Sequence, residues 1–461
     1  MQYDAIVIGT GQAGPSLAAR LAGAGWKVAI VERGRFGGTC VNTGCIPTKT
    51  LVASARAAWM ARHADDYGVV LDGPVSVDMA KVKARKDKVA GASRTGLETW
   101  LRTTTNCTVY QGHARFISDH EVAVGSETLI ADRIFINVGA RAAIPEIPGL
   151  TAVSFLTNSS MMDVDFLPPH LIIVGGSYIG LEFAQMYRRF GSRVSVVERG
   201  ARLLGREDAD VSESIFQILS GEGIDIHLGS DCISARNEGG EVAIRTTCDG
   251  GISEVRGSHL LLAVGRRPNT DDLGLENTGI LLNGHGTIQV DDELRTSVPG
   301  IWAIGECNGR GAFTHTSYND YEIVAANLLD GEHRSLNDRI TAYALYIDPP
   351  LGRAGLTESE VLRSGRPALI GRRRMSRVGR AVEKGETQGF MKVFVDAESK
   401  EILGAAILGT EGDEAIHCIL DTMYARAPYP VLQRAVHIHP TVSELIPTML
   451  GELVPLVRPQ D

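Results

Sequence analysis

Short apolar runs, each followed by a glycine, recur along the chain and predict buried strands. The first run spans residues 5–8, is followed by the helical pattern PSLAARLAGAGW, and leads to a second run, KVAIVE, that ends at Glu32. Two more apolar strands are expected within 133–149 and 259–270, each ending in V-G-[AR]-R. Strand, helix and strand in this order are typical of a βαβ unit, so parallel sheets are expected.

The turn after the first strand carries the pattern Gly9-x-Gly11-x-x-Gly14. Such glycines permit a tight turn and let the backbone approach a pyrophosphate, while the helix N-terminus faces the phosphates. Glu32, at the end of the next strand, is placed to accept hydrogen bonds from ribose hydroxyls. Together these features predict a dinucleotide site, although the glycine pattern alone also fits an incidental glycine-rich turn.

The same arrangement returns in the stretch HLIIVGGSYIGLEFAQMYRRFGSRVSVVERG. Gly175, Ser177 and Gly180 take the three glycine positions, and Glu198 ends the second strand at the same spacing as in the first unit. Ser177 puts a side chain where the backbone should approach phosphate, which weakens this second site slightly. Two such units predict two dinucleotides, one held permanently and one exchanged, which is the layout of a flavoprotein reductase.

From about residue 340 the pattern changes: the strand-like runs GFMKVFVD and EILGAAILG are followed by a helical run, DEAIHCILDTMYARA. The sequence thus predicts an α/β protein with two Rossmann-like dinucleotide-binding domains and a separate C-terminal α+β domain. A length of 461 residues, at roughly 150 residues per domain, fits this division into three.

The composition is that of an ordinary globular protein, with 44% hydrophobic and 22% charged residues. The net charge of −9 argues against non-specific binding of nucleic acid. No run of about 18 apolar residues is present to span a membrane. The N-terminus, MQYDAIVIGTG, lacks the basic and apolar regions of a signal peptide. We therefore expect neither a membrane nor a nucleic acid as partner.

Seven cysteines are too sparse for a framework of structural disulfides and favour a cytoplasmic protein. Cys40 and Cys45, in GGTCVNTGCIPTKT, are interpreted as a redox-active disulfide, two inert thiols or two metal ligands. A disulfide needs Cα atoms within about 7 Å, so a bonded pair excludes a regular helix over 40–45, which rises about 1.5 Å per residue. A metal site needs further ligands, which this stretch does not supply. The redox pair is favoured.

Six motifs occur together over essentially the whole length: the first glycine turn, GGTCVNTGCIPTK, the second nucleotide turn, AVGRRPNT, TSVPGIWAIGE and HIHPTVSE. With them the chain resembles the class I pyridine nucleotide-disulfide oxidoreductases, flavoproteins that include dihydrolipoamide dehydrogenase, glutathione reductase and mercuric reductase. The resemblance implies an FAD enzyme that moves electrons from NADH or NADPH to a small disulfide, or in reverse from a dithiol such as dihydrolipoamide. It also implies a homodimer whose active site is shared across the interface.

The resemblance also implies a division of the chain into four segments. Residues 1–150 are expected to form the first part of the FAD-binding domain, with the redox disulfide, and 151–270 the NAD(P)H-binding domain. Residues 271–338 would complete the FAD-binding and central domain, and 339–461 would form the dimerisation domain.

The resemblance assigns the catalytic cysteines and a base. Cys45 is the thiol nearer the flavin ring, in charge-transfer contact with it, and Cys40 is the interchange thiol that attacks the substrate disulfide. His439 is the acid/base, with Glu444 orienting its imidazole, and the partner subunit delivers it to the cysteines. These roles suit the chemistry, since thiolate is the reactive form of cysteine and histidine exchanges protons near neutral pH. Without the resemblance, a histidine in a surface turn is the simpler interpretation.

Three further side chains take roles by resemblance. Lys49 lies near flavin N5, where it stabilises negative charge on the reduced ring, and Glu182 is its partner. Tyr178 is the aromatic that covers the nicotinamide pocket and moves aside for the nucleotide. Taken alone, these residues also fit an ordinary surface lysine and a tyrosine packed at a helix start.

The expected ligand-binding residues fall into two sets, and no metal ligands are expected. The FAD set is Gly9, Gly11, Gly14, Glu32, Gly38, Thr39, Lys49, Gly139, Gly305 and Glu306. The NAD(P) set is Gly175, Tyr178, Ile179, Gly180, Glu198, Arg199 and Gly265.

NADH is the favoured nucleotide, because Glu198 would accept from a ribose 2′-hydroxyl and repel a 2′-phosphate. Arg199 and Arg202 follow at once and could instead bind such a phosphate.

Two departures from the family pattern bear on function. Glu306 stands where the family usually has aspartate, and its extra methylene shifts the carboxylate. No cysteine follows Cys418, whereas mercuric reductases carry a C-terminal pair and lack the acid/base histidine. Both the missing pair and the histidine argue against a true Hg(II) reductase. The alternative function is a mercuric-reductase-like metal-ion or quinone reductase without the C-terminal cysteine pair, and a flavin-bound sensor or structural subunit is a third.

Overall fold

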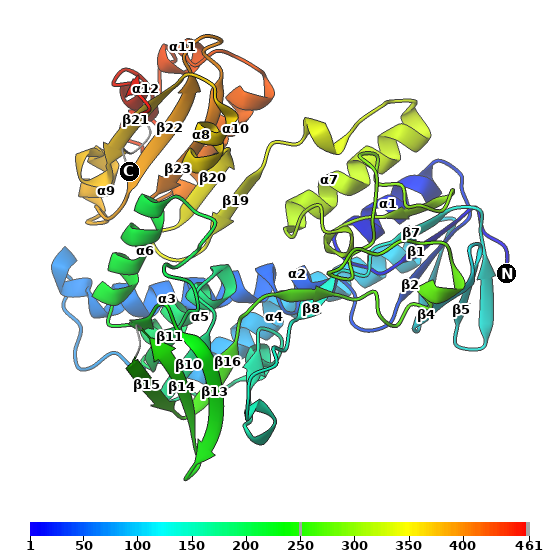
Figure 1. Cartoon of the computed structure of the whole chain (residues 1–461), viewed down its shortest axis with the longest axis horizontal. Coiled ribbons are helices and arrows are strands. Elements are labelled where there is room, and N and C mark those ends of the chain that lie inside the picture. The colour runs from blue at the N-terminus through cyan, green and yellow to red at the C-terminus, as the bar shows by residue number, and fades with distance from the viewer. Residues whose placement is uncertain (249–250, 458–461) are drawn as a thin grey trace.

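Two parallel sheets and one antiparallel sheet organise the chain, as seen in a computed structural model that describes residues 1–248 and 251–457 (Figure 1). The first sheet has the strand order β18-β7-β1-β2-β3 and is parallel throughout. Its strands are β1 (Ala5–Ile8), β2 (Val28–Glu32), β3 (Cys107–Gln111), β7 (Ile134–Ile136) and β18 (Ile301–Ala303). Its associated helices are α1 (Ala13–Gly23), α4 (Met79–Thr103) and α7 (Thr314–Ala325).

The second sheet repeats this design with the order β12-β11-β10-β16-β9, again parallel. Its strands are β9 (Leu156–Thr157), β10 (His170–Val174), β11 (Arg193–Val197), β12 (Asp225–His227) and β16 (His259–Leu262). The helices α5 (Tyr178–Phe190) and α6 (Ala209–Gly221) belong to this unit. An antiparallel meander packs against its sheet, formed by β13 (Asp231–Glu238), β14 (Glu241–Cys248) and β15 (Gly251–Gly257).

The C-terminal region is a six-stranded antiparallel sheet in the order β19-β20-β23-β22-β21-β24. Its strands are β19 (Ala342–Leu345), β20 (Leu351–Gly355), β21 (Ala368–Arg374), β22 (Phe390–Asp396), β23 (Ile402–Leu408) and β24 (Val454–Pro455). Its helices are α8 (Glu358–Ser364), α9 (Gly379–Glu383), α10 (Gly412–Tyr424), α11 (Pro430–Gln433) and α12 (Leu445–Leu450). The predicted strands and helix of this region are thereby confirmed.

Two small antiparallel pieces complete the fold. A three-stranded sheet consists of β4 (Ala114–Ser118), β5 (Glu121–Val124) and β6 (Glu127–Ile130). A two-stranded ribbon, β8 (Ala140–Ala142) with β17 (Arg266–Pro268), lies where the chain crosses between the two parallel sheets (Figure 1). The predicted class, two Rossmann-like units with a C-terminal α+β region, is confirmed.

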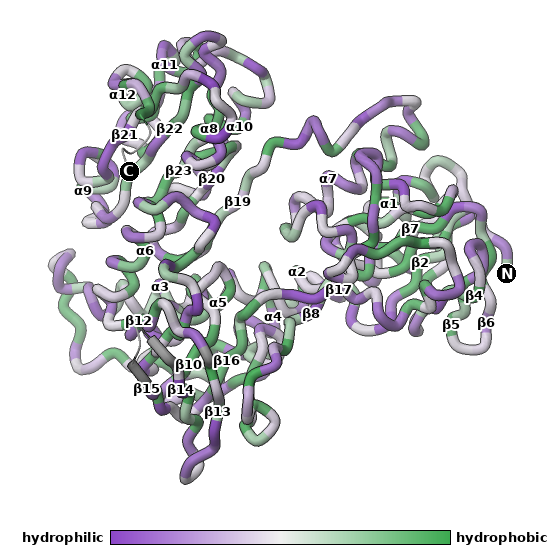
Figure 2. Tube along the Cα trace, viewed as in Figure 1, coloured by the Kyte–Doolittle hydropathy of each residue, from purple (hydrophilic) through white to green (hydrophobic). Residues whose placement is uncertain are grey.

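Burial explains why these segments form strands. All residues of β1 and β10 except the first of β10 are buried, as expected for central strands of parallel sheets covered on both faces. Hydrophobic segments follow the sheet strands in Figure 2, and hydrophilic ones follow many of the connections. Within the described residues, no helix combines the length and the apolar character needed to cross a membrane.

Two helices place the cysteine motif. The short helix α2 (Gly38–Asn42) ends before Gly44, and α3 (Cys45–Arg62) begins at the second cysteine and packs against α5 of the second unit. The predicted irregularity between Cys40 and Cys45 is confirmed.

Candidate active site

One large cavity, of about 2310 Å³, connects both glycine turns with the cysteine motif. Its lining includes Gly9 and Glu32 from the first unit, Gly175 and Glu198 from the second, and Cys45. Segments that are far apart in the sequence therefore share a single space that can hold two extended ligands.

The first glycine turn is shaped for a pyrophosphate. Gly9 has a φ of +104°, and a Cβ there would collide with the carbonyl oxygen of Asn137. A Cβ on Gly14 would collide with the carbonyl oxygen of Gly9, so the helix α1 starts in close contact with the strand. Gly38, at a φ of +58°, packs on the backbone of Gly11. The turn leaves the N-terminus of α1 open to the cavity, and the residues present therefore fit a dinucleotide such as FAD.

The second turn reproduces this geometry. Gly175 has a φ of +116°, and a Cβ on it would meet the carbonyl oxygen of Ala263. A Cβ on Gly180 would meet the carbonyl oxygen of Gly175. Ser177 precedes the first residue of α5 in extended conformation and is exposed, so its side chain does not obstruct the turn.

The two strand-end carboxylates are held alike. Glu32 accepts hydrogen bonds from the backbone N–H groups of Thr10 and Gly34, at 3.0 and 2.7 Å. Glu198 accepts from Gly176 and Gly200, at 2.5 and 2.6 Å. Each carboxylate thus fastens its own turn to its own strand end, a role that the sequence did not reveal, while still lining the cavity. Carboxylate oxygens accept more than one hydrogen bond, so ribose binding remains compatible.

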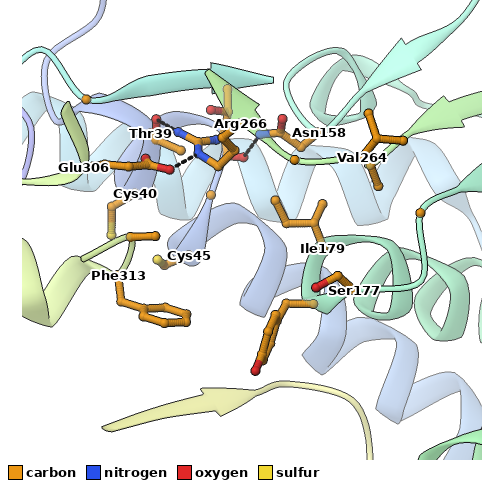
Figure 3. A pocket seen from close by; sticks show the side chains of 18 of the residues that line it. Thr39, Cys40, Cys45, Asn158, Ser177, Ile179, Val264, Arg266, Glu306 and Phe313 are labelled. Atoms are coloured by element: carbon orange, nitrogen blue, oxygen red, sulfur yellow. Dashed lines mark hydrogen bonds and ion pairs between the residues drawn. The ribbon is translucent and has the colours of Figure 1, made fainter. Parts of the chain in front are cut away.

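The two cysteines lie together on one wall of the cavity (Figure 3). Cys40 is half-buried and Cys45 is exposed, and both are free cysteines. The Thr314 hydroxyl lies 3.1 Å from the Cys45 sulfur, close enough for a hydrogen bond. Phe313, the residue before it, lies beside Cys45 in Figure 3.

The pair is electrostatically asymmetric. A hydrogen bond from Cys40, helped by Thr314 and the positive charge of Lys49, lowers the pKa of Cys45 to about 6 against the opposing effect of burial. The same hydrogen bond, together with burial, raises the pKa of Cys40. In the reduced protein Cys45 is therefore a thiolate at neutral pH, while Cys40 stays a thiol until a base takes its proton.

This asymmetry predicts the pH dependence of the thiolate. In the reduced protein the ultraviolet thiolate absorbance of Cys45 should be present at neutral pH and should half-disappear as the pH falls through about 6. Cys45→Ser should remove this transition, and Cys418→Ser, a half-buried thiol on α10, should retain it. A midpoint near about 8.5, the ordinary cysteine value, would contradict the assignment.

Lys49 lies one turn after Cys45 on α3 and is held in place from two sides. Its ammonium donates to both oxygens of Glu182, each at 2.8 Å. It also lies 4.4 Å from the ring centroid of Tyr346, whose backbone N–H donates to Glu182. The pairing of Lys49 with Glu182 is as expected, and Tyr346 is an additional neighbour that the sequence did not indicate.

Glu306 has a partner that the sequence did not reveal. Glu306 accepts from Arg266 Nε at 2.6 Å, and the other end of this guanidinium reaches the Ala140 carbonyl and the Thr39 hydroxyl (Figure 3). The longer glutamate side chain thus reaches an arginine on β17. Gly305 has a φ of +77°, which favours glycine.

The remaining expected residues are located as follows. Ile179 lines the cavity, as do Gly139 and Gly265, which have φ values of +62° and +125°. Arg199 is exposed and pairs loosely with Asp231 at 3.4 Å.

The expected base lies elsewhere on the surface of the chain. His439 follows α11, its side chain is 80% exposed, and it is not among the residues that line the cavity. Its Nδ1 lies 2.9 Å from one oxygen of Glu444, as the motif predicts. In this arrangement Nδ1–H donates to the carboxylate, which leaves Nε2 as the proton acceptor. One subunit alone therefore does not bring this histidine to its own cysteines.

Nothing in the described part of the chain resembles a metal centre. No group of three or more potential ligands lies together there. Cys307 is fully buried, and burial raises its pKa to about 12, as expected for a packing residue.

Comparisons with known proteins identify the family. Residues 3–320 match the pyridine nucleotide-disulphide oxidoreductase family, and residues 341–450 match its dimerisation domain, which indicates a homodimer. The chain is 36% identical to the probable pyridine nucleotide-disulfide oxidoreductase RclA of Escherichia coli strain K12, over 99% of this chain and all of that protein. It is 32% identical to a dihydrolipoyl dehydrogenase of Chlamydia muridarum, over 96% of this chain and 95% of that protein.

A solved structure shows the same fold. The HOCl-induced flavoprotein disulfide reductase RclA from Escherichia coli superposes with a TM-score of 0.89 at 34% identity, covering 97% of this chain and 99% of that one. The chain therefore belongs to the class I pyridine nucleotide-disulfide oxidoreductases, FAD-dependent enzymes that exchange electrons between a pyridine nucleotide and a disulfide.

Proposed function

We propose that Cys40 and Cys45 are the redox pair through which this enzyme reduces a low-molecular-weight disulfide, with electrons from NADH. The observation that carries the proposal is the break at Gly44, which sets both sulfurs on the wall of a cavity that also contains both nucleotide turns. Bound FAD supplies the two-electron relay between the nucleotide and this pair.

The cysteines account for the transfer to substrate. Deprotonated Cys40 attacks one sulfur of the substrate disulfide, forming a mixed disulfide and expelling the first substrate thiolate, which takes a proton from His439 of the partner subunit. The Cys45 thiolate then attacks the Cys40 sulfur, which restores the Cys40–Cys45 disulfide and releases the second substrate thiolate. The net reaction consumes NADH and one proton for each disulfide converted into two thiols.

The supporting roles follow the geometry. Lys49 is fixed by Glu182 and places a positive charge one helical turn from Cys45. This charge would stabilise the negative charge of a reduced flavin. We assign FAD to residues 1–150 and 271–338, the nucleotide to 151–270, and the subunit interface to 339–461. The sparse cysteines support a reducing compartment, and we place the enzyme in the cytoplasm.

Anaerobic titration of the holoenzyme tests the proposal. NADH should reduce it by two electrons and produce a long-wavelength absorbance from a thiolate next to oxidised flavin, and Cys45→Ser should lack this band. Turnover should then be supported by a small disulfide in a panel that also contains Cu(II), Hg(II) and quinones. A protein that is reduced by nucleotide but turns over only metal ions or quinones would refute the disulfide assignment.

Nucleotide choice yields a separate prediction. The efficiency kcat/KM should be about tenfold higher with NADH than with NADPH, because the Glu198 carboxylate repels a 2′-phosphate. Glu198→Gln should narrow this ratio, since the amide carries no charge to repel a 2′-phosphate, although it keeps only one of the two oxygens that accept from Gly176 and Gly200. Glu213→Gln, an exposed change on α6, serves as control. A several-fold higher kcat/KM with NADPH in the wild type would contradict the assignment of NADH as the preferred nucleotide.

A further inference from the structure

A buried carboxylate outside the expected site connects the second nucleotide unit with the C-terminal sheet. Glu207, just before α6, has a side chain with no exposed surface. One oxygen accepts from the hydroxyls of Tyr178 at 3.1 Å and Tyr343 at 2.6 Å. The other oxygen accepts from the fully buried guanidinium of Arg353 at 2.6 Å. The first tyrosine begins α5, whereas Tyr343 and Arg353 come from β19 and β20.

The two tyrosines belong to an aromatic cluster beside the redox pair. The rings of Tyr178 and Tyr343 meet edge to face at 5.6 Å, and Phe313 stacks on Tyr343 at 5.5 Å. Phe313 also meets the edge of Tyr178 at 6.1 Å. It directly precedes Thr314, whose hydroxyl contacts the Cys45 sulfur. The Tyr178 side chain therefore reaches from the second nucleotide turn to the cysteine wall, and all of these residues except Glu207 and Arg353 line the cavity.

Glu207 has its counter-charge in the C-terminal region. A buried carboxylate without a counter-charge would be costly, and the guanidinium of Arg353 supplies that charge at 2.6 Å. Arg353 also binds Asp208 at 2.6 Å, and the fully buried Lys392 on β22 lies 2.9 Å from Asp208. Burial and the neighbouring Glu207 raise the pKa of both Tyr178 and Tyr343, so both phenols remain donors.

We propose that Glu207 is a positioning residue that holds the Tyr178 ring across the path from the second nucleotide turn to Cys45. Arg353 holds the Glu207 carboxylate in place, so a nucleotide that reaches the redox pair must break the hydrogen bond between Tyr178 and Glu207. The inference rests on the proposed function, because it assigns the pyridine nucleotide to the second turn.

Two measurements test the positioning role of Glu207. They are the Kd of NAD⁺ and of NADP⁺, from equilibrium titrations of the oxidised holoenzyme, and the KM of NADH and of NADPH. Tyr178→Phe keeps the ring and removes only the hydroxyl, and Glu207→Gln removes the charge. Each should lower the Kd and KM of the nucleotide that the wild type uses, by about fivefold, the value of an ordinary hydrogen bond. The double variant should match Tyr178→Phe alone, because without the Tyr178 hydroxyl the change at Glu207 has no hydrogen bond to Tyr178 left to weaken.

Tyr110→Phe is the matched control, since its hydroxyl bonds Tyr3 at 2.8 Å away from the cavity and should not affect nucleotide affinity. Additive effects in the double variant, or an unchanged or raised Kd in Tyr178→Phe, would overturn the inference while leaving the proposed function intact. If Glu207→Gln does not retain FAD, the nucleotide Kd of Tyr178→Phe decides between the two outcomes. A wild-type holoenzyme that neither nucleotide reduces would overturn both.

Discussion

Cys40→Ser should abolish disulfide turnover, with kcat/KM for the disulfide falling by about 10³-fold or more. A serine hydroxyl is neither acidic enough nor nucleophilic enough to attack sulfur, and it forms no disulfide with Cys45. The flavin should still be reduced by nucleotide, because the proposed function places Cys40 on the substrate side of the pair. The measurement is NADH oxidation coupled to the disulfide that the wild type reduces, alongside anaerobic reduction of the bound flavin.

Cys418→Ser is the matched control for Cys40→Ser. Its thiol is also half-buried, but it lies on α10 and donates to the carbonyl of Ala415. This variant should keep wild-type turnover. Substantial disulfide reduction by Cys40→Ser would show that the flavin or another thiol transfers the electrons. The alternative function, a metal-ion or quinone reductase, would then be favoured.

The sequence predicted the parallel sheets well because their determinants are local. Apolar runs with β-branched residues form buried strands. Each of Gly9 and Gly175 has a positive φ, and a Cβ there would strike the carbonyl oxygen of the residue that follows a neighbouring strand. The break between Cys40 and Cys45 was also a local matter, because Thr43 and Gly44 leave the helical conformation between α2 and α3.

Contacts between distant segments could not be read from periodicity. Lys49 and Glu182 are 133 residues apart, and only the resemblance to a known family paired them. Arg266 and Glu306 meet because β17 crosses between the two sheets, which no local pattern specifies. Glu207 was missed for a similar reason, since its partner Tyr343 lies 136 residues away in another sheet.

The repeated carboxylate geometry could be predicted from the sequence only in part. In both units a strand-end glutamate binds the backbone just after the first glycine and two residues beyond itself. The sequence showed that Glu32 and Glu198 occupy equivalent positions, but not that each fastens its own turn. Replacing either residue is therefore expected to disturb the shape of its turn as well as ribose binding.

His439→Ala should lower disulfide turnover by about 10²- to 10⁴-fold, the usual contribution of a general acid/base. The raised pKa of Cys40 means that its thiol needs a base, and the leaving thiolate needs a proton. Glu444→Gln should cause a smaller loss, because the imidazole remains but loses the carboxylate that orients it. His437→Ala, whose imidazole faces the carbonyl of Ala435, is the control. Equal turnover in His439→Ala and the wild type would contradict the assignment.

Mixed dimers test whether His439 acts on the partner subunit's cysteines. If one site is built from Cys40 of one subunit and His439 of the other, a heterodimer of Cys40→Ser and His439→Ala subunits contains one fully intact site. A random mixture should then recover about a quarter of wild-type turnover, since half of the dimers are mixed and each has one working site of two. Two affinity tags on co-expressed subunits would isolate the mixed species. A purified heterodimer as inactive as its parents would place each histidine with the cysteines of its own chain.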